Sequence, residues 1–201
     1  MATEKDTNKK FNNKEIIHDF GIDEANIENK AIESRIRELS IAGAGTRSII
    51  KLGDNVLRAK TRVVNYFGHR LWTLLDDMKL TTLKSDGVGL AAPQIAILKK
   101  IVVIMFRGEE FELINPVISN EIGESIAPEG CLSVPSSMNC YVKRPYKLTL
   151  SYQDRYGKRH EGEFDNYLAR IICHEVDHLN GILFIDRKCP PPEEESRKDP
   201  V

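Results

Sequence analysis

The chain lacks any hydrophobic run that approaches the length of about 18 residues needed to cross a bilayer as a helix. It also lacks an excess of positive charge, because its 201 residues carry 29 basic and 30 acidic side chains, a formal net charge of −1. This balance excludes the strongly basic surfaces typical of proteins that bind nucleic acids or anionic membranes. We therefore expect no membrane partner and no direct nucleic-acid partner.

Cysteine is scarce, and the first residues lack the apolar segment of a secretory signal. Without export to an oxidising compartment, free thiols are expected in preference to disulfides. A free thiol can serve as a metal ligand, so the cysteines are candidates for such a site. They are Cys131, Cys140, Cys173 and Cys189.

Composition divides the chain into three parts. Residues 1–45 form a charged N-terminal extension, residues 46–188 form the predicted catalytic domain, and residues 189–201 form a proline- and charge-rich tail. Within the extension, the apolar spacing between Glu24 and Leu39 indicates a short helix, while its high charge is equally typical of a solvated arm.

Within the domain, the apolar periodicity predicts an α+β fold, with mostly antiparallel strands packed around a C-terminal helix and a second long helix before the sheet. The predicted helices are 62–82 and 165–181, and the predicted strands are 101–106, 110–114 with a continuation at 117–124, 146–152 and 159–164. The stretch 128–135 is predicted to be irregular.

The segment 165–181 contains the pattern H-E-x-x-H. His174 and His178 are separated by four residues and therefore lie on one face of a helix, where two imidazoles can bind one metal ion. Glu175 is rotated by about 100° from His174, which makes it a poor third ligand but lets it reach a water near the metal. Asp165 is a candidate N-cap, and Asn180 with Gly181 indicates the end of the helix. The alternative is a helix whose His and Glu side chains are merely hydrogen-bonded.

The sequence offers several candidates for a third ligand. In the extended zinc-protease pattern Gly181 is correctly placed, but the final histidine is replaced by Phe184. Asp186 follows the helix too closely to reach back easily, and Cys173 points to another flank. Cys140 and Cys189 lie in segments without a supporting pattern.

Cys131 is the best candidate, by a modest margin. It lies in a glycine-flanked loop, with Glu129 two residues before it and Ser133 two residues after it, and both could brace the loop. A separate glycine-rich stretch, 87–94, is a weak phosphate-loop pattern. Its small residues indicate close approach of the backbone to a ligand or a strand, with Gln94 projecting from it; a glutamine that only caps loop backbone is the alternative.

Three stretches together resemble the signature motifs of peptide deformylase. They occur in the expected order: GVGLAAPQ at 87–94, EGCLS at 129–133 and HEVDHLNG at 174–181. The resemblance covers about residues 49 to 187. Two features depart from the family pattern, namely Cys173 where many relatives have glutamine, and the N-terminal extension, which is unlike compact bacterial forms.

The resemblance implies a metal-dependent hydrolase that removes the N-formyl group from the N-terminal formyl-methionine of newly synthesised polypeptides and releases formate. It implies that Cys131, His174 and His178 bind one divalent ion per chain. Fe²⁺ is expected, and Zn²⁺, Co²⁺ or Ni²⁺ can occupy the site; ligand type alone would have favoured zinc. Glu175 would act as general base and then general acid on the metal-bound water.

The resemblance also implies how the peptide is held. The Gln94 amide and the Leu132 backbone N–H would stabilise the oxyanion. The methionine side chain would lie in a slot formed by Val88, Tyr167 and Ile171. The backbone around Gly89 and Gly130 would pair with the peptide like an added strand.

The expected partner is a formyl-methionyl nascent chain at the ribosome; the sequence does not give the oligomeric state. The asparagine- and lysine-rich extension leads us to expect an organelle with bacterial-type translation, a plastid, apicoplast or mitochondrion, with the bacterial cytoplasm as the alternative. Two rival functions remain. One is a metallopeptidase that cuts internal peptide bonds, and the other is a structural metal module with His160 as a fourth ligand, in which Glu175 would have no task.

Overall fold

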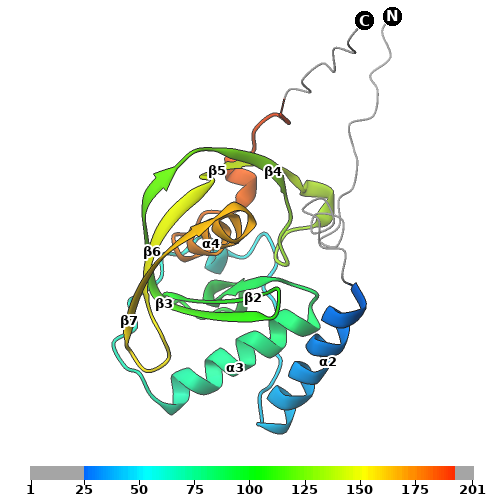
Figure 1. The fold of residues 1–201 in the computed structure, drawn as a ribbon, viewed down its shortest axis with the longest axis vertical. Helices are drawn as coiled ribbons and strands as arrows, with labels where there is room; N and C mark the ends of the chain where they lie inside the picture. The colour runs from blue at the N-terminus through cyan, green and yellow to red at the C-terminus, as the bar shows by residue number, and fades with distance from the viewer. Residues whose placement is uncertain (1–24, 193–201) are drawn as a thin grey trace, which may run out of the picture.

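The computed structural model describes residues 25–192, so the first 24 residues of the predicted extension and most of the predicted tail lie outside it. The described helices are α2 (Ala25–Ile41), α3 (His69–Lys84) and α4 (Asn166–Leu179). The strands are β1 (Gly89–Ala91), β2 (Ile101–Phe106), β3 (Glu109–Ile122), β4 (Ser125–Glu129), β5 (Cys140–Arg144), β6 (Lys147–Gln153) and β7 (Arg159–Asp165). This arrangement is an α+β fold, as predicted (Figure 1).

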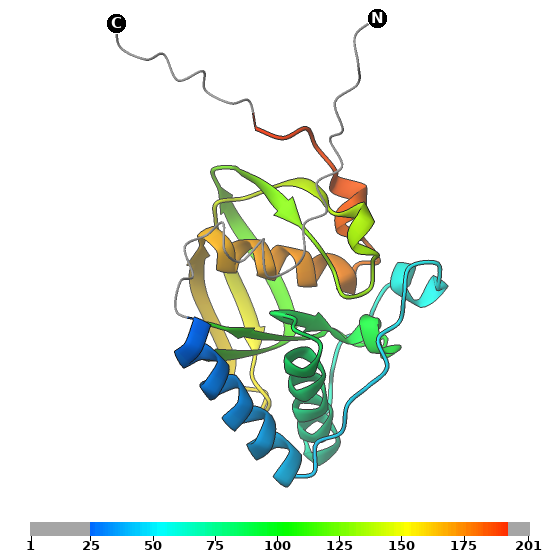
Figure 2. The same ribbon diagram turned by 90° about the vertical axis from the view of Figure 1, so that its right-hand side faces the viewer.

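The strands form two antiparallel sheets around α4. The larger sheet has five strands in the order β1-β2-β3-β6-β7, and β4 pairs with β5 in a separate ribbon. Figures 1 and 2 show α4 between the β4–β5 ribbon and the larger sheet, with α3 on the opposite side of that sheet and α2 beside α3. The C-terminal helix is therefore enclosed by strands on two sides, which explains its burial.

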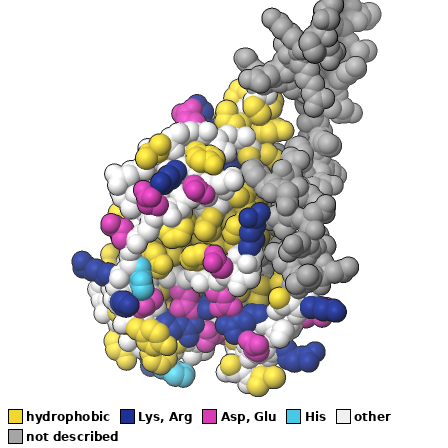
Figure 3. Space-filling view, viewed as in Figure 1, with side chains coloured by type: hydrophobic (Ala, Val, Ile, Leu, Met, Phe, Trp, Pro, Cys, Tyr) yellow, Lys and Arg dark blue, Asp and Glu magenta, His cyan; other side chains and the backbone are white. Residues whose placement is uncertain are grey.

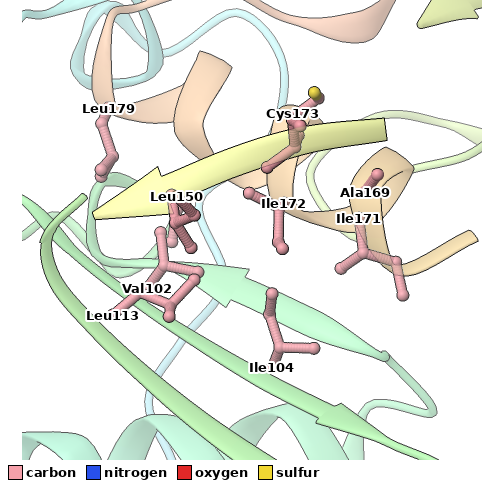
Figure 4. Packing of buried hydrophobic residues seen from close by; sticks show 11 residues of the cluster. Val102, Ile104, Leu113, Leu150, Ala169, Ile171, Ile172, Cys173 and Leu179 are labelled. Atoms are coloured by element: carbon pink, nitrogen blue, oxygen red, sulfur yellow. The ribbon is translucent and has the colours of Figure 1, made fainter. Parts of the chain in front are cut away.

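The larger sheet is covered on both faces, and β2 shows why. Its sequence Ile-Val-Val-Ile alternates between two hydrophobic clusters: Val102 and Ile104 pack with α4, while Ile101 and Val103 pack with α3. A strand buried on both faces has a continuous apolar sequence, and complete burial of each such side chain contributes about 1.5–3 kcal/mol. Figure 4 shows the α4 side of this core, where Val102, Ile104 and Leu113 lie opposite Ile171 and Ile172.

Charged side chains of both signs lie together on the face that Figure 3 shows. Figure 3 shows acidic and basic groups in a band across the lower part of the molecule, at the level of α3 and α2 in Figure 1. Beside α3, Glu112 of β3 accepts hydrogen bonds from Arg155 and forms an ion pair with the buried Lys79 at 2.6 Å. Within residues 25–192, no helix combines the length and hydrophobicity that crossing a membrane requires.

Three predicted element boundaries were wrong. The first domain helix begins at His69 instead of residue 62, because Asn115 holds the preceding segment extended: its side chain accepts the Val64 N–H at 2.8 Å and donates to the Val64 carbonyl at 2.9 Å. The break expected at Asn115 does not end the strand: the predicted segments 110–114 and 117–124 form one strand, β3, which runs to Ile122. Asn115 lies within it at φ of +53°, in an irregularity of the β3–β6 pairing, a conformation that asparagine tolerates.

The third error concerns the segment after β3. The stretch around Pro128 is not wholly irregular, because β4 pairs with β5 from Ser125↔Arg144 to Glu129↔Cys140. Cys140 accordingly lies in a strand and not in a loop. This ribbon was missed because its strands are short and β5 mixes charged with apolar residues.

Candidate active site

Helix α4 carries the H-E-x-x-H residues on a buried surface. His178 and Glu175 are 1% and 4% exposed. Asp165 occupies the predicted N-cap position, but its side chain makes no capping hydrogen bond. The helix ends where predicted, at Asn180 and Gly181. Gly181 has φ of +74°, and a Cβ there would collide with the Arg58 backbone, so only glycine fits this turn.

Cys131 approaches both histidines. Its Sγ and one nitrogen of each of His174 and His178 all lie within 4.8 Å of one another, and the Sγ lies 3.3 Å from Nε2 of His178. The ring centroids of His174 and His178 are 5.1 Å apart and the ring planes are inclined at 74°, an edge-to-face arrangement. A sulfur and two imidazole nitrogens at these separations are a donor set and spacing that suit a tetrahedral metal site with one position left open.

Glu129 organises this cluster from behind. Its Oε2 accepts from Nδ1 of His174 at 2.9 Å, which leaves Nε2 of that ring free for the cluster. Arg144 binds both carboxylate oxygens at 2.9 Å, and Arg170 binds Oε1 at 2.7 Å. Burial alone would raise the pKa of Glu129, but hydrogen bonds from His174 and Arg144 outweigh it and hold the pKa well below its usual range. Glu129 therefore stays ionised although it is buried.

Gln94 faces the same sulfur from the other side. Its Nε2 lies 3.4 Å from Cys131 Sγ and 3.2 Å from Ser133 Oγ, while its Oε1 accepts the Ala91 N–H at 2.8 Å. The sequence left two interpretations of Gln94, a residue that caps backbone and a residue that projects toward a ligand. Each describes part of the geometry, because the side-chain oxygen binds backbone and the amide nitrogen points to the sulfur.

A segment before the domain's first helix ties the two motif loops together, and sequence reasoning missed it. The Ile50 N–H donates to the Gln94 carbonyl at 2.8 Å. The Lys51 ammonium donates to the Leu132 carbonyl, and the Leu52 N–H to the Ser133 carbonyl, each at 2.7 Å. No sequence pattern marks this contact, because two of the three donors are backbone groups that any residue supplies.

One pocket of about 70 Å³ opens onto this cluster. All five residues predicted for the peptide site line it, namely Val88, Gly89, Gly130, Tyr167 and Ile171. Cys131, His174, Glu175, Gln94 and Leu132 also line it, whereas His178 does not. Asp86, Pro128 and Arg170 line it as well and were not predicted.

Glu175 is held in a setting suited to proton transfer. Burial raises the pKa of Glu175 to about 7. Its Oε2 has no hydrogen-bond partner among the described residues, and neither has Nδ1 of His178. The carboxylate packs directly against Gly89, where a Cβ would come within 2.5 Å of Oε1. The glycine is therefore required by the close approach of β1 to α4, as its small-residue context indicated.

Known proteins match both the sequence and the fold. A sequence profile described as polypeptide deformylase matches residues 46–193. The peptide deformylase of Thermoanaerobacter pseudethanolicus is 49% identical over 141 residues, which are 70% of this chain and 88% of that protein. This chain belongs to the polypeptide deformylase family. The family assignment and the type of enzyme predicted from the three motifs are thereby confirmed.

Solved peptide deformylase structures have the same fold as this deformylase. The crystal structure from Thermotoga maritima aligns with a TM-score of 0.70 at 37% identity, covering 72% of this chain and 99% of that one. A structure from Acinetobacter baumannii with Met-Ala-Ser bound aligns with a TM-score of 0.68 at 32% identity and covers 72% of this chain and 99% of that one. Helix α2 precedes the family match, which begins at residue 46.

The other candidate ligands lie apart from the cluster in this deformylase. His160 binds Asp154 at 2.8 Å and stacks on Tyr152, so it is not placed as a fourth ligand. Asp186 forms an ion pair with Arg58. Cys173 lines a different pocket, on the side of α4 that carries Asp177. The described residues therefore bring one thiol, that of Cys131, to the two histidines.

Proposed function

We propose that this deformylase removes the formyl group of formyl-methionyl peptides at the pocket between β1 and α4, with Cys131, His174 and His178 as ligands of one divalent cation and Glu175 as the proton-transfer group. The observation that carries the proposal is the convergence of one sulfur and two imidazoles within 4.8 Å beside a buried carboxylate with a free oxygen. A closed structural site would leave that carboxylate without a task.

The chain fits a bound cation. Two neutral imidazoles and one thiolate would leave a divalent ion with a net charge of +1, and Glu129 supplies the hydrogen bond that orients the His174 ring. When bound, the ion would polarise the formyl carbonyl and lower the pKa of water. The family is metal-dependent; Fe²⁺ is the metal we propose, on the resemblance, with Zn²⁺, Co²⁺ and Ni²⁺ as alternatives.

Glu175 performs the proton transfers in this proposal. Its carboxylate accepts a proton from the attacking water and passes it to the amine that leaves as the formyl C–N bond breaks. A pKa of about 7 suits both roles near neutral pH, and a cation bound nearby would lower it. The bond cleaved is the formamide bond, so the products are formate and a peptide with a free amino group.

Gln94 and Leu132 stabilise the oxygen of the tetrahedral intermediate. The Gln94 amide nitrogen lies 3.4 Å from Cys131 Sγ and so stands next to the site where the formyl group would be held. Leu132 follows the cysteine directly, lines the pocket and has its carbonyl bound by Lys51, so its backbone N–H is the second candidate donor. One preorganised donor of this kind contributes roughly 3–4 kcal/mol to transition-state stabilisation.

The peptide would bind along β1. This strand is the last of its sheet among the described residues, so one edge is paired with β2 and the other has no strand partner. Gly89 of β1 lines the pocket. An extended peptide can add to such an edge, with backbone groups near Gly89 and Gly130 as partners. Val88, Tyr167 and Ile171 then form the slot for the methionine side chain.

The decisive assay compares formate release from formyl-Met-Ala-Ser with cleavage of unformylated peptides by anaerobically purified protein, with metal analysis of the same sample. Formate release without internal cleavage supports the proposal, and internal cleavage alone would favour the metallopeptidase. Glu175→Gln should keep its metal but lose turnover, because the amide cannot accept the proton. The matched control Glu161→Gln, on the exposed part of β7, should retain activity.

The natural substrate would be a nascent chain that starts with formyl-methionine, presented at the ribosome. The relative from Thermoanaerobacter pseudethanolicus named above is bacterial, as is that of Caldicellulosiruptor bescii with 47% identity. They support the bacterial cytoplasm that we weighed as the alternative, and they lend no support to an organelle. Localisation of a tagged full-length chain in the source cell tests this point.

A further inference from the structure

Helix α2 lies outside the family match, yet it packs on the part of the domain that leads into the pocket. We propose that α2 is a positioning element for the peptide-binding strand β1, with Leu39 as its main contact. The inference rests on the proposed function, because it assumes that the peptide pairs with β1. It assigns a role in peptide binding to a helix that family membership does not explain.

Leu39 anchors the helix. It is 3% exposed and packs with Leu80 and Leu83 of α3, and the partly buried Ile36 and Met105 join the same cluster. Met105 belongs to β2, so this small cluster connects α2 to the sheet as well as to α3. Ile41, two residues further along α2, is 81% exposed, which shows that the contact is confined to one face of the helix.

Met105 is linked directly to the pocket. Its backbone N–H donates to the Val88 carbonyl at 2.8 Å, and the adjacent Ile104 pairs with Gly89. Val88 and Gly89 both line the pocket. The described β1 has a strand partner on one edge only, namely β2. The position of Val88 and Gly89 therefore depends on their pairing with Ile104 and Met105.

Charged side chains also contact the residue that pairs with Met105. Glu110 of β3 lies opposite Met105 in the β2–β3 pairing. Arg35 of α2 donates to Glu110 Oε2 at 3.0 Å, and Lys79 of α3 donates to the same oxygen at 2.7 Å. Helix α2 thus contacts one rung of the hairpin twice, with apolar side chains on Met105 and a guanidinium on Glu110.

The connection after α2 reaches the pocket by a second path. The Gly45 N–H donates to Asp77 Oδ1 at 2.7 Å, and the Arg47 N–H donates to Thr81 Oγ1 at 2.9 Å. One residue further along α3, the Thr82 carbonyl accepts the Gly87 N–H at 3.0 Å. Gly87 also lines the pocket. The two paths meet at adjacent residues, Gly87 and Val88, immediately before the peptide-binding strand.

This arrangement has a specific consequence for binding. Loosening α2 weakens the hydrogen bonds that the β1 backbone offers to an extended peptide. The metal ligands and Glu175 are carried by α4 and the Cys131 loop, which are not in this contact, and a looser β1 does not crowd the Glu175 carboxylate that packs against Gly89. The loss should therefore depend on the length of the peptide. It should raise KM for substrates that continue past methionine and leave kcat unchanged.

The test compares Leu39→Ala with the matched control Ile41→Ala in the full-length metal-loaded chain, on formyl-Met-Ala-Ser and on formyl-methionine amide. For Leu39→Ala we expect KM for the tripeptide to rise roughly three- to tenfold, which corresponds to weakening one or two hydrogen bonds. KM for the amide and kcat for both substrates should match the wild type. Ile41→Ala should change none of these values.

Other outcomes overturn the inference. An equal loss on both substrates would show that α2 only stabilises the fold, and unchanged kinetics would show that the contact is irrelevant to binding. If Leu39→Ala does not fold, Arg35→Gln removes the ion pair to Glu110 without a cavity and should raise the tripeptide KM selectively, by about twofold or more. A wild-type chain that releases no formate would instead refute the proposed function, so the two failures are distinguishable.

Discussion

The carboxylate of Glu129 and the imidazole of His174 are joined by a hydrogen bond of 2.9 Å between Oε2 and Nδ1, across 45 residues of sequence. This contact sets which ring nitrogen of His174 is available to the cluster formed with Cys131 and His178. It links the β4–β5 ribbon to α4, because Glu129 ends β4 and is also bound by Arg144 at the end of β5.

Replacing Glu129 by Gln should weaken metal binding about 10- to 100-fold, because the amide no longer accepts as strongly from His174. It should also destabilise the fold by roughly 3–5 kcal/mol, since Arg144 and Arg170 lose a buried counter-charge. Metal titration and denaturant unfolding measure the two effects. Glu124→Gln, at an exposed pair with Lys143, is the control and should leave both values unchanged.

Gly89→Ala should lower kcat, because the added Cβ would lie 2.5 Å from Glu175 Oε1 and displace the carboxylate. A loss of about 100-fold is expected, given that proton transfer by a positioned group contributes roughly 10²–10⁴-fold. Gly162→Ala is the control, because a Cβ there meets Phe164 at 3.4 Å, an ordinary contact. Equal kinetics for the two variants would contradict the close approach of β1 to the catalytic helix.

Removing the metal with a chelator should lower the thermal unfolding midpoint. The cation binds the folded chain and not the unfolded one, so its removal takes away the stabilisation that binding provides. Cys131→Ser should bind metal far more weakly and should gain little stability when metal is added. Cys189→Ser, at the end of the described domain, should behave like the wild type in both respects. Full metal occupancy in Cys131→Ser would exclude the proposed ligand set.

Acid should weaken the charged network that joins Glu110 and Glu112 of β3 to Arg35, Lys79 and Arg155. Burial alone would raise the pKa values of Glu112 and Glu110, but hydrogen bonds from Arg155, Arg35 and Lys79 outweigh it, so both pKa values lie below normal. A carboxylate with a depressed pKa contributes stability above its unfolded pKa of about 4.3 and loses it as pH falls through the folded value.

The free energy of unfolding should therefore be insensitive to these groups above about pH 6 and should fall between about pH 5 and pH 3. Urea denaturation at a series of pH values measures this dependence, and Glu112→Gln should flatten it. The variant Glu163→Gln, whose partner Lys147 is exposed, is the control. An unfolding free energy that rises as the pH is lowered would contradict the sign of the effect.

Much of the fold could be predicted because it depends on local pattern. The boundaries of β2 were predicted correctly, since a run of buried β-branched residues between turns has few alternatives. The helix carrying His174 and His178 was placed within one or two residues at each end. The β4–β5 ribbon was not predicted, because its strands are short and β5 mixes charged with apolar residues. The start of α3 was not predicted, because it depends on the contact between Asn115 and Val64, which are 51 residues apart.

The three motif stretches by themselves were enough to identify the family and to name the chemistry that each side chain can perform, since these properties follow from residue type and short spacing. Long-range packing decided which of these side chains meet in space. It brings Cys131, and not Cys173, to the imidazoles, and it places Glu129 in hydrogen-bond contact with His174. It also packs Leu39 of α2 beside Met105. A linear spacing constrains residues within a few turns of one another. The meeting of side chains separated by tens of residues depends instead on how the sheet, the ribbon and the helices bury their apolar faces together.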